Sequence, residues 1–261
     1  MFKFCSLYSG SSGNSSLIQT KKTKILVDAG VSAKKIADSL KSLNIEPAEI
    51  DAIIVTHEHS DHTNGIGIFS KKYNIPVYAN IETWNAMPAQ KDKVDAKNIK
   101  YFNFEDFYIK DLRISPFSIP HDAANPCGFN IFYNNKKISI ATDIGHISTE
   151  ILDKLSNSSF LLLESNYDLN TLKCSKYPYP LKQRIYGKNG HLSNDDAGKT
   201  ISYLASHGLN TVMLGHLSKE NNFPELAYKT VIDQLIEDNI ENNIKLSVAD
   251  RYNISPVIDI I

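Results

Sequence analysis

The chain has 261 residues, of which 42% are hydrophobic and 22% are charged. Its 28 basic and 29 acidic residues nearly cancel, so the formal net charge is −1 with histidine neutral. This is ordinary globular composition, which argues against a disordered, collagenous or coiled-coil protein. No apolar run approaches the roughly 18 residues of a membrane span, so we expect no membrane association. The charge balance excludes binding of nucleic acid by bulk positive charge but is compatible with a local basic groove.

The N-terminus and the cysteines favour a reducing compartment. The first residues contain no basic segment followed by a long apolar one, so we expect no secretory signal. The three cysteines are an odd number without CxxC spacing, which argues against a disulfide framework and against a thiolate metal site. We therefore expect a cytoplasmic protein.

The first third of the chain is predicted to consist mainly of short strands. Apolar runs bounded by turn residues indicate strands over residues 2–7, 16–19 and 24–28. Helical spacing of apolar residues after a capping serine predicts a helix over residues 32–43. A buried strand over residues 52–56 leads directly into His57.

The remainder alternates strands with helices. The same signals predict a helix over residues 148–155, a capped helix from Ser193 to about Ser206, and the longest helix over residues 224–240. They predict strands over residues 77–79, 99–102, 107–109, 113–117, 129–133, 137–141, 160–163 and 211–214, with a hairpin turn at Asn134-Asn135. Runs of strands with interspersed helices favour two sheets packed face to face with helices outside, forming a single domain over residues 1–261.

The strongest signal for function is the HxHxDH string that runs from His57 to His62. Three imidazoles and one carboxylate within six residues are costly to hold together without a cation, and these are ligand types suited to Zn²⁺ and related divalent ions. Alternation along an extended segment directs His57 and His59 to the same side, whereas a turn can present Asp61 and His62 in another direction. The string therefore predicts two adjacent metal sites.

Three further residues that could bind metal follow predicted strands. His121 comes just after one strand, Asp143 follows a second, and His216 follows a third. Each alone could be a surface or turn residue, but the repeated pattern of a strand followed by a potential ligand supports a shared metal site.

These motifs together resemble the metallo-β-lactamase fold superfamily of binuclear metallohydrolases, from about Ser9 to His216. The resemblance implies an α+β fold, a four-layer αββα sandwich with the metals at one edge of the sheets. It implies two divalent ions, Zn²⁺ first and Mn²⁺ or Fe²⁺ as alternatives. It further implies that one metal is held by His57, His59 and His121, that the other is held by Asp61, His62 and His216, and that Asp143 bridges them.

The branch of the superfamily is indicated by departures from other patterns. The bridging residue is Asp143 rather than cysteine, which disfavours β-lactam hydrolases, and residue 59 is His rather than Glu, which disfavours flavodiiron oxygen reductases. Glu164 after a strand and His191 before a helix resemble the proton-donating pair of RNase Z-like nucleases, with Ser193 in place of a threonine. We count these two residues with Asp61 as catalytic, although His191 could instead merely cap the helix.

The whole pattern is most similar to the WalJ/YycJ-like subgroup. This resemblance implies a phosphodiesterase, specifically a 5′-to-3′ exonuclease, with DNA favoured over RNA as the substrate. The alternative is a glyoxalase II-like hydrolase of a small acyl or thioester substrate. A third hypothesis is a non-catalytic, metal-stabilised binding module. Oligomeric state is left open, and a homo-oligomer is compatible with the sequence.

Two segments supply candidate substrate contacts. The serine-rich loop over residues 9–15 offers backbone N–H groups and polar side chains for an anion, although it could be only a turn. Basic residues before His191 could contact a phosphate backbone, although a solvated loop is the simpler reading. The candidate substrate contacts are Ser11, Ser12, Asn14, Lys182, Arg184 and Ser193.

Overall fold

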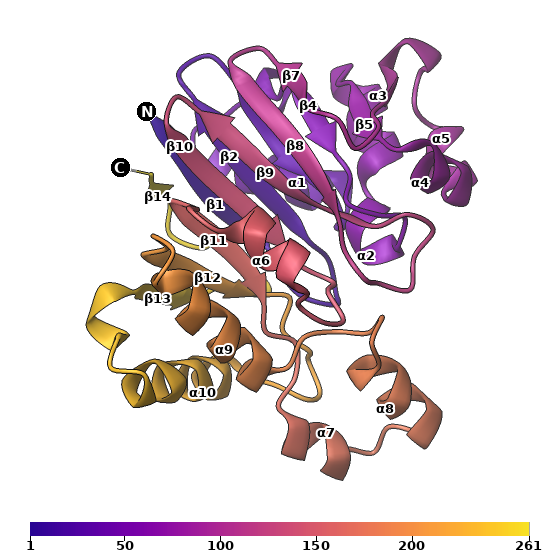
Figure 1. Ribbon diagram of the computed structural model, residues 1–261. Coiled ribbons are helices and arrows are strands. Elements are labelled where there is room, and N and C mark those ends of the chain that lie inside the picture. Colours follow the sequence, from indigo (N-terminus) through magenta and orange to yellow (C-terminus); the bar gives the residue numbers. More distant parts are fainter. Residues whose placement is uncertain (261) are drawn as a thin grey trace. The chain divides into compact units, whose positions relative to one another are not determined.

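A computed structural model describes residues 1–260 (Figure 1). The chain forms two compact units. Unit 1 contains residues 1–116, residues 123–127 and the C-terminal segment from Asp250, and unit 2 contains residues 117–122 and 128–249. Each unit has a hydrophobic core of its own. The single domain over residues 1–261 stays a prediction.

Unit 1 is built around a seven-stranded sheet with the order β14-β1-β2-β3-β4-β5-β6. The β14-β1-β2-β3 part is antiparallel, whereas the pairs from β3 to β6 are parallel. Because β3 and β4 are parallel neighbours, the residues that follow them emerge at the same edge of the sheet. The strands are β1 (Phe2–Tyr8), β2 (Ser15–Thr20), β3 (Lys24–Val27), β4 (Ala52–Ile54), β5 (Val77–Ala79), β6 (Ile99–Tyr101) and β14 (Ile258–Asp259).

The helices of unit 1 pack on one face of this sheet. Ile36 and Leu40 are fully buried at helical spacing and share a core with Phe69, while the Ser32 side chain caps the first helix. The helices are α1 (Ala33–Ser42), α2 (Ser60–Thr63), α3 (Ile66–Tyr73), α4 (Ile81–Ala86) and α5 (Pro88–Lys91), with short 3₁₀ turns η1 (Pro47–Glu49) and η2 (Ala96–Asn98).

The second sheet has the order β13-β12-β11-β10-β9-β8-β7, and its strand β8 enters unit 2 at Phe117. Strands β10 to β13 are parallel, so their carboxyl ends lie at one edge. Strands β9 and β10 form the predicted hairpin through Asn134-Asn135. The strands are β7 (Phe107–Ile109), β8 (Leu112–Ser118), β9 (Cys127–Tyr133), β10 (Lys136–Ala141), β11 (Phe160–Glu164), β12 (Thr211–Gly215) and β13 (Lys245–Val248).

Three helices of unit 2 cover its strands (Figure 1), and their apolar faces share a core with β11 and β12. Two other helices, α7 and α8, pack instead around a small separate cluster of Tyr167, Leu172 and Ile185. Among residues 1–260 no helix has the length and apolar character needed to span a bilayer. The helices are α6 (Thr149–Leu155), α7 (Leu169–Cys174), α8 (Tyr179–Tyr186), α9 (Asn194–Ala205) and α10 (Pro224–Glu237), with the 3₁₀ turn η3 (Glu241–Asn243).

Each strand and helix that the sequence predicts is present, with shifts at some ends. The strand expected over residues 24–28 ends at Val27, because Asp28 adopts a left-handed backbone with φ of 61°. The longest helix ends at Glu237 rather than at residue 240, just before Asn239 with φ of 57°. The elements not predicted from the sequence are the helices α2 to α5, α7 and α8 and the strands β13 and β14.

Candidate metal centre

The HxHxDH string of unit 1 forms a tight group after the buried strand β4. The rings of His57 and His59 lie 4.7 Å apart between centroids, and those of His57 and His62 lie 4.2 Å apart. Asp61 Oδ2 lies 3.6 Å from His62 Nε2. His57 and His62 are fully buried, whereas His59 and Asp61 are partly exposed. The structure thus brings all four predicted ligands of this string together.

Asp28, directly after β3, supports this group through a carboxylate that is almost fully buried. Its Oδ1 accepts a hydrogen bond of 2.8 Å from the Thr56 backbone N–H, and its Oδ2 accepts one of 2.9 Å from the Thr56 hydroxyl. The same Oδ2 lies 2.8 Å from His62 Nδ1. A carboxylate at this distance favours the proton on Nδ1, which leaves Nε2 as the ring nitrogen of His62 that carries a lone pair.

The serine-rich loop of unit 1 packs against the same string. Asn14 Oδ1 accepts from the Gly10 N–H at 2.8 Å, and Asn14 Nδ2 lies 3.0 Å from His62 Nε2 and 3.3 Å from the Asp61 carbonyl oxygen. A Cβ atom on Gly30 would lie 1.6 Å from that carbonyl oxygen, so only glycine fits there. The loop therefore sets the position of Asp61.

Unit 2 gathers the ends of β10, β11 and β12. Asp143 follows β10, Glu164 ends β11, and His216 follows β12. His216 Nε2 lies 3.4 Å from Asp143 Oδ1, and His121 Nε2 lies 3.8 Å from the same oxygen. Asp143, Glu164, His191 and His216 each offer one ligand atom within 4.8 Å of the others. Parallel pairing of three adjacent strands is what brings these residues to one edge.

Glu164 is the centre of the hydrogen-bond network in unit 2, and it is fully buried. Its Oε1 lies 2.8 Å from His191 Nδ1 and 2.7 Å from His216 Nδ1. Its Oε2 accepts backbone N–H bonds from Ile144 at 2.8 Å and from Leu192 at 3.1 Å. One carboxylate therefore orients two imidazoles and fixes the loops that carry Asp143 and His191.

Burial and charge set the protonation of these groups. Burial lowers the pKa of His121 below its ordinary value, which favours the neutral imidazole that metals bind. Burial opposes protonation of His191, but the charge and hydrogen bond of Glu164, with the Asp143 charge, outweigh it and raise the pKa. Burial alone would raise the pKa of Glu164, yet the neighbouring His191 and His216 hold it below its usual range.

The hydrogen-bond pattern of the histidines fits divalent metal ions. A metal-ligating histidine usually donates its second ring N–H to a carboxylate or a carbonyl oxygen. His62 has Asp28 as that partner, His216 has Glu164, and His121 Nδ1 lies 3.0 Å from the Gly190 carbonyl oxygen. In all three residues Nε2 is then the ring nitrogen with a lone pair, as a metal ligand requires.

Three residues of these groups have left-handed backbones, with φ of 61° at Asp28, 58° at Asp143 and 53° at His216. Of the other non-glycine residues with positive φ in the described chain, all but Lys110 are asparagines, which tolerate this conformation. Non-glycine residues in this region cluster at functional sites. The sharp turn after each strand directs the side chain across the sheet edge.

The predicted substrate contacts have varied surroundings. Ser11 and Ser12 are exposed, and Asn14 is buried against the HxHxDH string. Lys182 Nζ donates to the Lys173 carbonyl oxygen at 2.7 Å, and Arg184 Nε donates to the Asp122 carboxylate beside His121. The hydroxyl of Ser193 caps α9 by accepting from the Asp196 N–H, so the capping role lies with Ser193 and not with His191.

Sequence reasoning assigned no role to Asp28 or Asn166. Asp28 carried a usable signal, since it follows a strand as Asp143 does. Asn166 Nδ2 donates to the His216 carbonyl oxygen at 2.7 Å, and no sequence pattern singled it out for this contact.

Comparison with known proteins gives a consistent result. Residues 8–190 match the Metallo-beta-lactamase superfamily. The chain is 39% identical over 252 residues to exodeoxyribonuclease WalJ of Streptococcus pneumoniae, covering 95% of this chain and 94% of that protein. It is 35% identical to exodeoxyribonuclease YycJ of Bacillus anthracis, covering 90% of this chain and 89% of that one.

Solved structures show the same fold. The crystal structure of Zn²⁺-bound PqqB from Methylobacterium extorquens matches with a TM-score of 0.72 at 14% identity, covering 98% of this chain and 99% of that one. With the sequence match, this confirms the predicted α+β fold of the metallo-β-lactamase type. The family together with the His/Asp groups implies that the chain binds divalent metal ions.

Proposed function

The chain belongs to the metallo-β-lactamase superfamily, and we propose that it is a DNA exonuclease that uses two divalent metal ions. Two relatives that cover nearly the whole chain at 35% and 39% identity are named exodeoxyribonucleases. The ligand types present, imidazole and carboxylate, suit a metal-dependent hydrolase.

The observation that carries the proposal is the contact between Glu164 and His191. His191 Nδ1 lies 2.8 Å from Glu164 Oε1, and the carboxylate raises the pKa of the ring. The alkoxide that leaves a phosphodiester needs a proton, whereas the thiolate that leaves a thioester is stable without one. A buried carboxylate that favours the protonated form of an imidazole beside Asp143 and His216 therefore favours phosphodiester over thioester hydrolysis.

We assign the ligands as the family resemblance implies. His57, His59 and His121 would hold one ion, Asp61, His62 and His216 would hold the other, and Asp143 would be shared. Zn²⁺ suits this histidine-rich set best, with Mn²⁺ or Fe²⁺ as alternatives. When bound, the ions supply Lewis acidity and lower the pKa of water toward neutrality.

The chain's own residues supply orientation and the proton. Glu164 holds Nδ1 of His191, so Nε2 is the atom that delivers the proton to the leaving oxygen. The same carboxylate holds His216 in its ligand tautomer, and Asp28 does so for His62. Asn14 keeps Asp61 in place through its side-chain and backbone contacts.

The polarity of digestion, 5′ to 3′, and the preference for DNA over RNA belong to the same proposal, as does a cytoplasmic site of action. The names of the two relatives support DNA as the substrate. The three cysteines are all free, in keeping with a reducing compartment.

The test compares metal-loaded wild type with His191→Ala on labelled DNA, labelled RNA, bis(p-nitrophenyl) phosphate and a thioester. We expect DNA cleavage by the wild type, with kcat lowered by about 10²- to 10⁴-fold in His191→Ala and metal content unchanged by elemental analysis. Thioester cleavage without phosphodiester cleavage would replace the proposal with the acyl-hydrolase alternative. Loss of metal in His191→Ala would make His191 a ligand rather than the proton donor.

A further inference from the structure

A hollow of about 340 Å³ lies in unit 2 between the loop after β10, helix α6 and one face of α9. Its lining mixes three kinds of chemistry. Ile147 and Leu192 contribute apolar surface, Tyr203 contributes an aromatic ring, and Lys199 and Asp196 contribute opposite charges.

One end of this hollow is connected to the Glu164–His191 pair through Leu192, which lines it. Leu192 follows His191 in the chain, and its backbone N–H donates to Glu164 Oε2 at 3.1 Å. His146 also lines the hollow, and it lies two residues after Ile144, whose backbone N–H donates to the same oxygen at 2.8 Å. Two segments that line the hollow are thus anchored to the carboxylate that orients His191.

The aromatic wall is held in place and accessible. The ring of Tyr203 stacks on that of His207, with centroids 4.4 Å apart and planes inclined by 21°. Tyr203 nonetheless keeps 45% of its surface exposed. A ring fixed on one side and exposed elsewhere is suited to stack on a planar ligand.

The charges complete a nucleotide-like pattern. Lys199 is exposed and forms no ion pair within residues 1–260, so its ammonium is available to a phosphate. Asp196 accepts from the Ser193 hydroxyl at 2.8 Å and can accept a further N–H bond, such as one from a base amine. An apolar and aromatic wall, a cation and an acceptor match a base with its attached phosphate.

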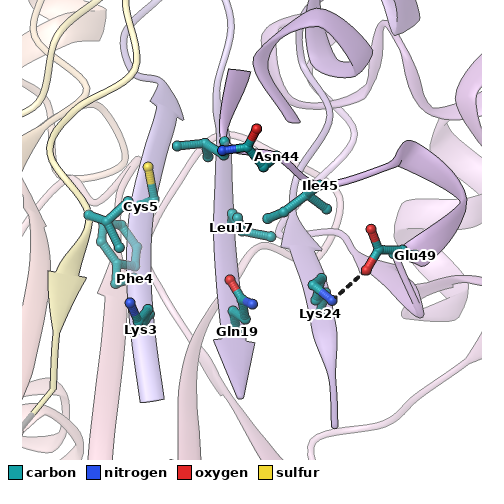
Figure 2. A pocket seen from close by; sticks show the side chains of 11 residues that line it. Lys3, Phe4, Cys5, Leu17, Gln19, Lys24, Asn44, Ile45 and Glu49 are labelled. Carbon is teal, nitrogen blue, oxygen red and sulfur yellow. Dashed lines mark hydrogen bonds and ion pairs between the residues drawn. The ribbon is translucent and has the colours of Figure 1, made fainter. Parts of the chain in front are cut away.

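A cavity in unit 1 offers a contrast. Its volume is about 330 Å³, and it lies beside β1, β2 and β3 (Figure 2). Both of its cations are already neutralised, since Lys24 lies 2.8 Å from Glu49 and Lys3 lies 3.3 Å from Asp259. It therefore lacks the available positive charge that the hollow of unit 2 provides.

We propose that the hollow of unit 2 is a nucleotide subsite for the DNA strand. The base packs on Tyr203 and Ile147, and Lys199 binds the adjoining phosphate. This inference rests on the proposed nuclease function and adds residues that hold the strand.

The experiment measures the kinetics of Tyr203→Ala and Lys199→Ala on two substrates. One is a labelled single-stranded oligonucleotide. The other is bis(p-nitrophenyl) phosphate, which is too small to contact His191 and the hollow at the same time. We expect KM for the oligonucleotide to rise about tenfold, the effect of losing one base stack, and to rise at least fivefold more than KM for the small diester. Tyr203→Phe and Lys199→Arg should restore most of the affinity, because they keep the ring and the charge.

The matched controls are Tyr228→Ala and Lys229→Ala on α10. Tyr228 is 41% exposed, a fraction similar to the 45% of Tyr203, and both control residues lie outside the hollow. The subsite is refuted if Tyr203→Ala and Lys199→Ala change the oligonucleotide KM no more than these controls, or if they affect both substrates equally.

Equilibrium binding separates this inference from the proposed function. Fluorescence anisotropy of a labelled oligonucleotide gives Kd without turnover. If the wild type cleaves neither substrate, the proposed function fails, and a tenfold weaker Kd for Tyr203→Ala would still support the subsite. Equal Kd values for wild type and Tyr203→Ala would refute the subsite whether or not the enzyme cleaves DNA.

Discussion

Replacing Asp28 by asparagine should weaken metal binding without disturbing the backbone. Asparagine has nearly the same shape and tolerates the left-handed φ of 61° at this position. Its side chain, however, has one acceptor oxygen where the carboxylate has two. The substitution therefore tests the hydrogen bonds and the charge of Asp28 rather than its conformation.

The expected magnitude follows from the three contacts of the carboxylate. If the amide oxygen of the introduced asparagine takes the place of Oδ1 and keeps the bond from the Thr56 N–H, the NH₂ group faces His62 Nδ1 in place of Oδ2. His62 must then accept at Nδ1 and carry its proton on Nε2, the atom assigned to the metal. Loss of such a supporting partner typically costs about 10- to 100-fold in metal affinity, or about 1.4 to 2.8 kcal/mol.

The assay is competition with a chromophoric chelator, which gives the Kd for Zn²⁺ of each variant. Asp111→Asn is the matched control, because Asp111 also accepts from threonine hydroxyls, those of Thr20 and Thr23, within unit 1. We expect wild-type Zn²⁺ affinity in this control. A Kd in Asp28→Asn equal to that of the wild type, with both proteins folded, would refute the role assigned to Asp28.

Two further predictions concern stability and packing. Burial lowers the pKa of Lys137 from 10.5 to about 8. The unfolded chain therefore holds the proton of this amine more tightly than the folded chain does. As a result, the contribution of Lys137 to the free energy of unfolding should increase from pH 8 to 10.5. The free energy of unfolding of wild type relative to Lys137→Met should rise by up to about 3 kcal/mol over that range, and parallel pH profiles in urea titrations would contradict this. Gly30→Ala should lower Zn²⁺ affinity at least tenfold by displacing Asp61. Gly198→Ala is the control and should retain the affinity, because its Cβ would lie 3.0 Å from the Gln234 side chain and no nearer than 3.6 Å to the Val231 backbone. Equal Zn²⁺ affinities of the two variants would show that the segment around Gly30 adapts.

Much of the strand pattern could be predicted because buried strands of parallel sheets are short continuous apolar runs. Residues 52–54 and 160–163 are of this kind, and every one of their side chains is buried. The helices α7 and α8 escaped prediction for the opposite reason. They pack on a cluster of only three buried side chains, so their apolar residues are too few to form a clear helical period.

The site was predictable to the extent that its residues follow strands. His57, Asp143 and His216 stand out in the sequence because each comes after an apolar run. The resemblance also paired Glu164 with His191. What the sequence could not show is that Glu164 contacts His216 as well, because this contact depends on the parallel pairing of β11 with β12, which no local pattern specifies.

The strained backbone at His216 explains why so many buried amides surround it. A left-handed non-glycine residue costs on the order of 1–3 kcal/mol unless its surroundings hold it. Asn166 Nδ2 donates to the His216 carbonyl oxygen at 2.7 Å, and Asn222 Nδ2 donates to the Ser165 carbonyl oxygen at 2.9 Å. Asn194 in turn exchanges side-chain hydrogen bonds of 3.1 and 2.8 Å with Asn222. These buried amides hold the turn after β12 with the turn after β11, so His216 and Glu164 keep their mutual geometry before any metal or substrate binds.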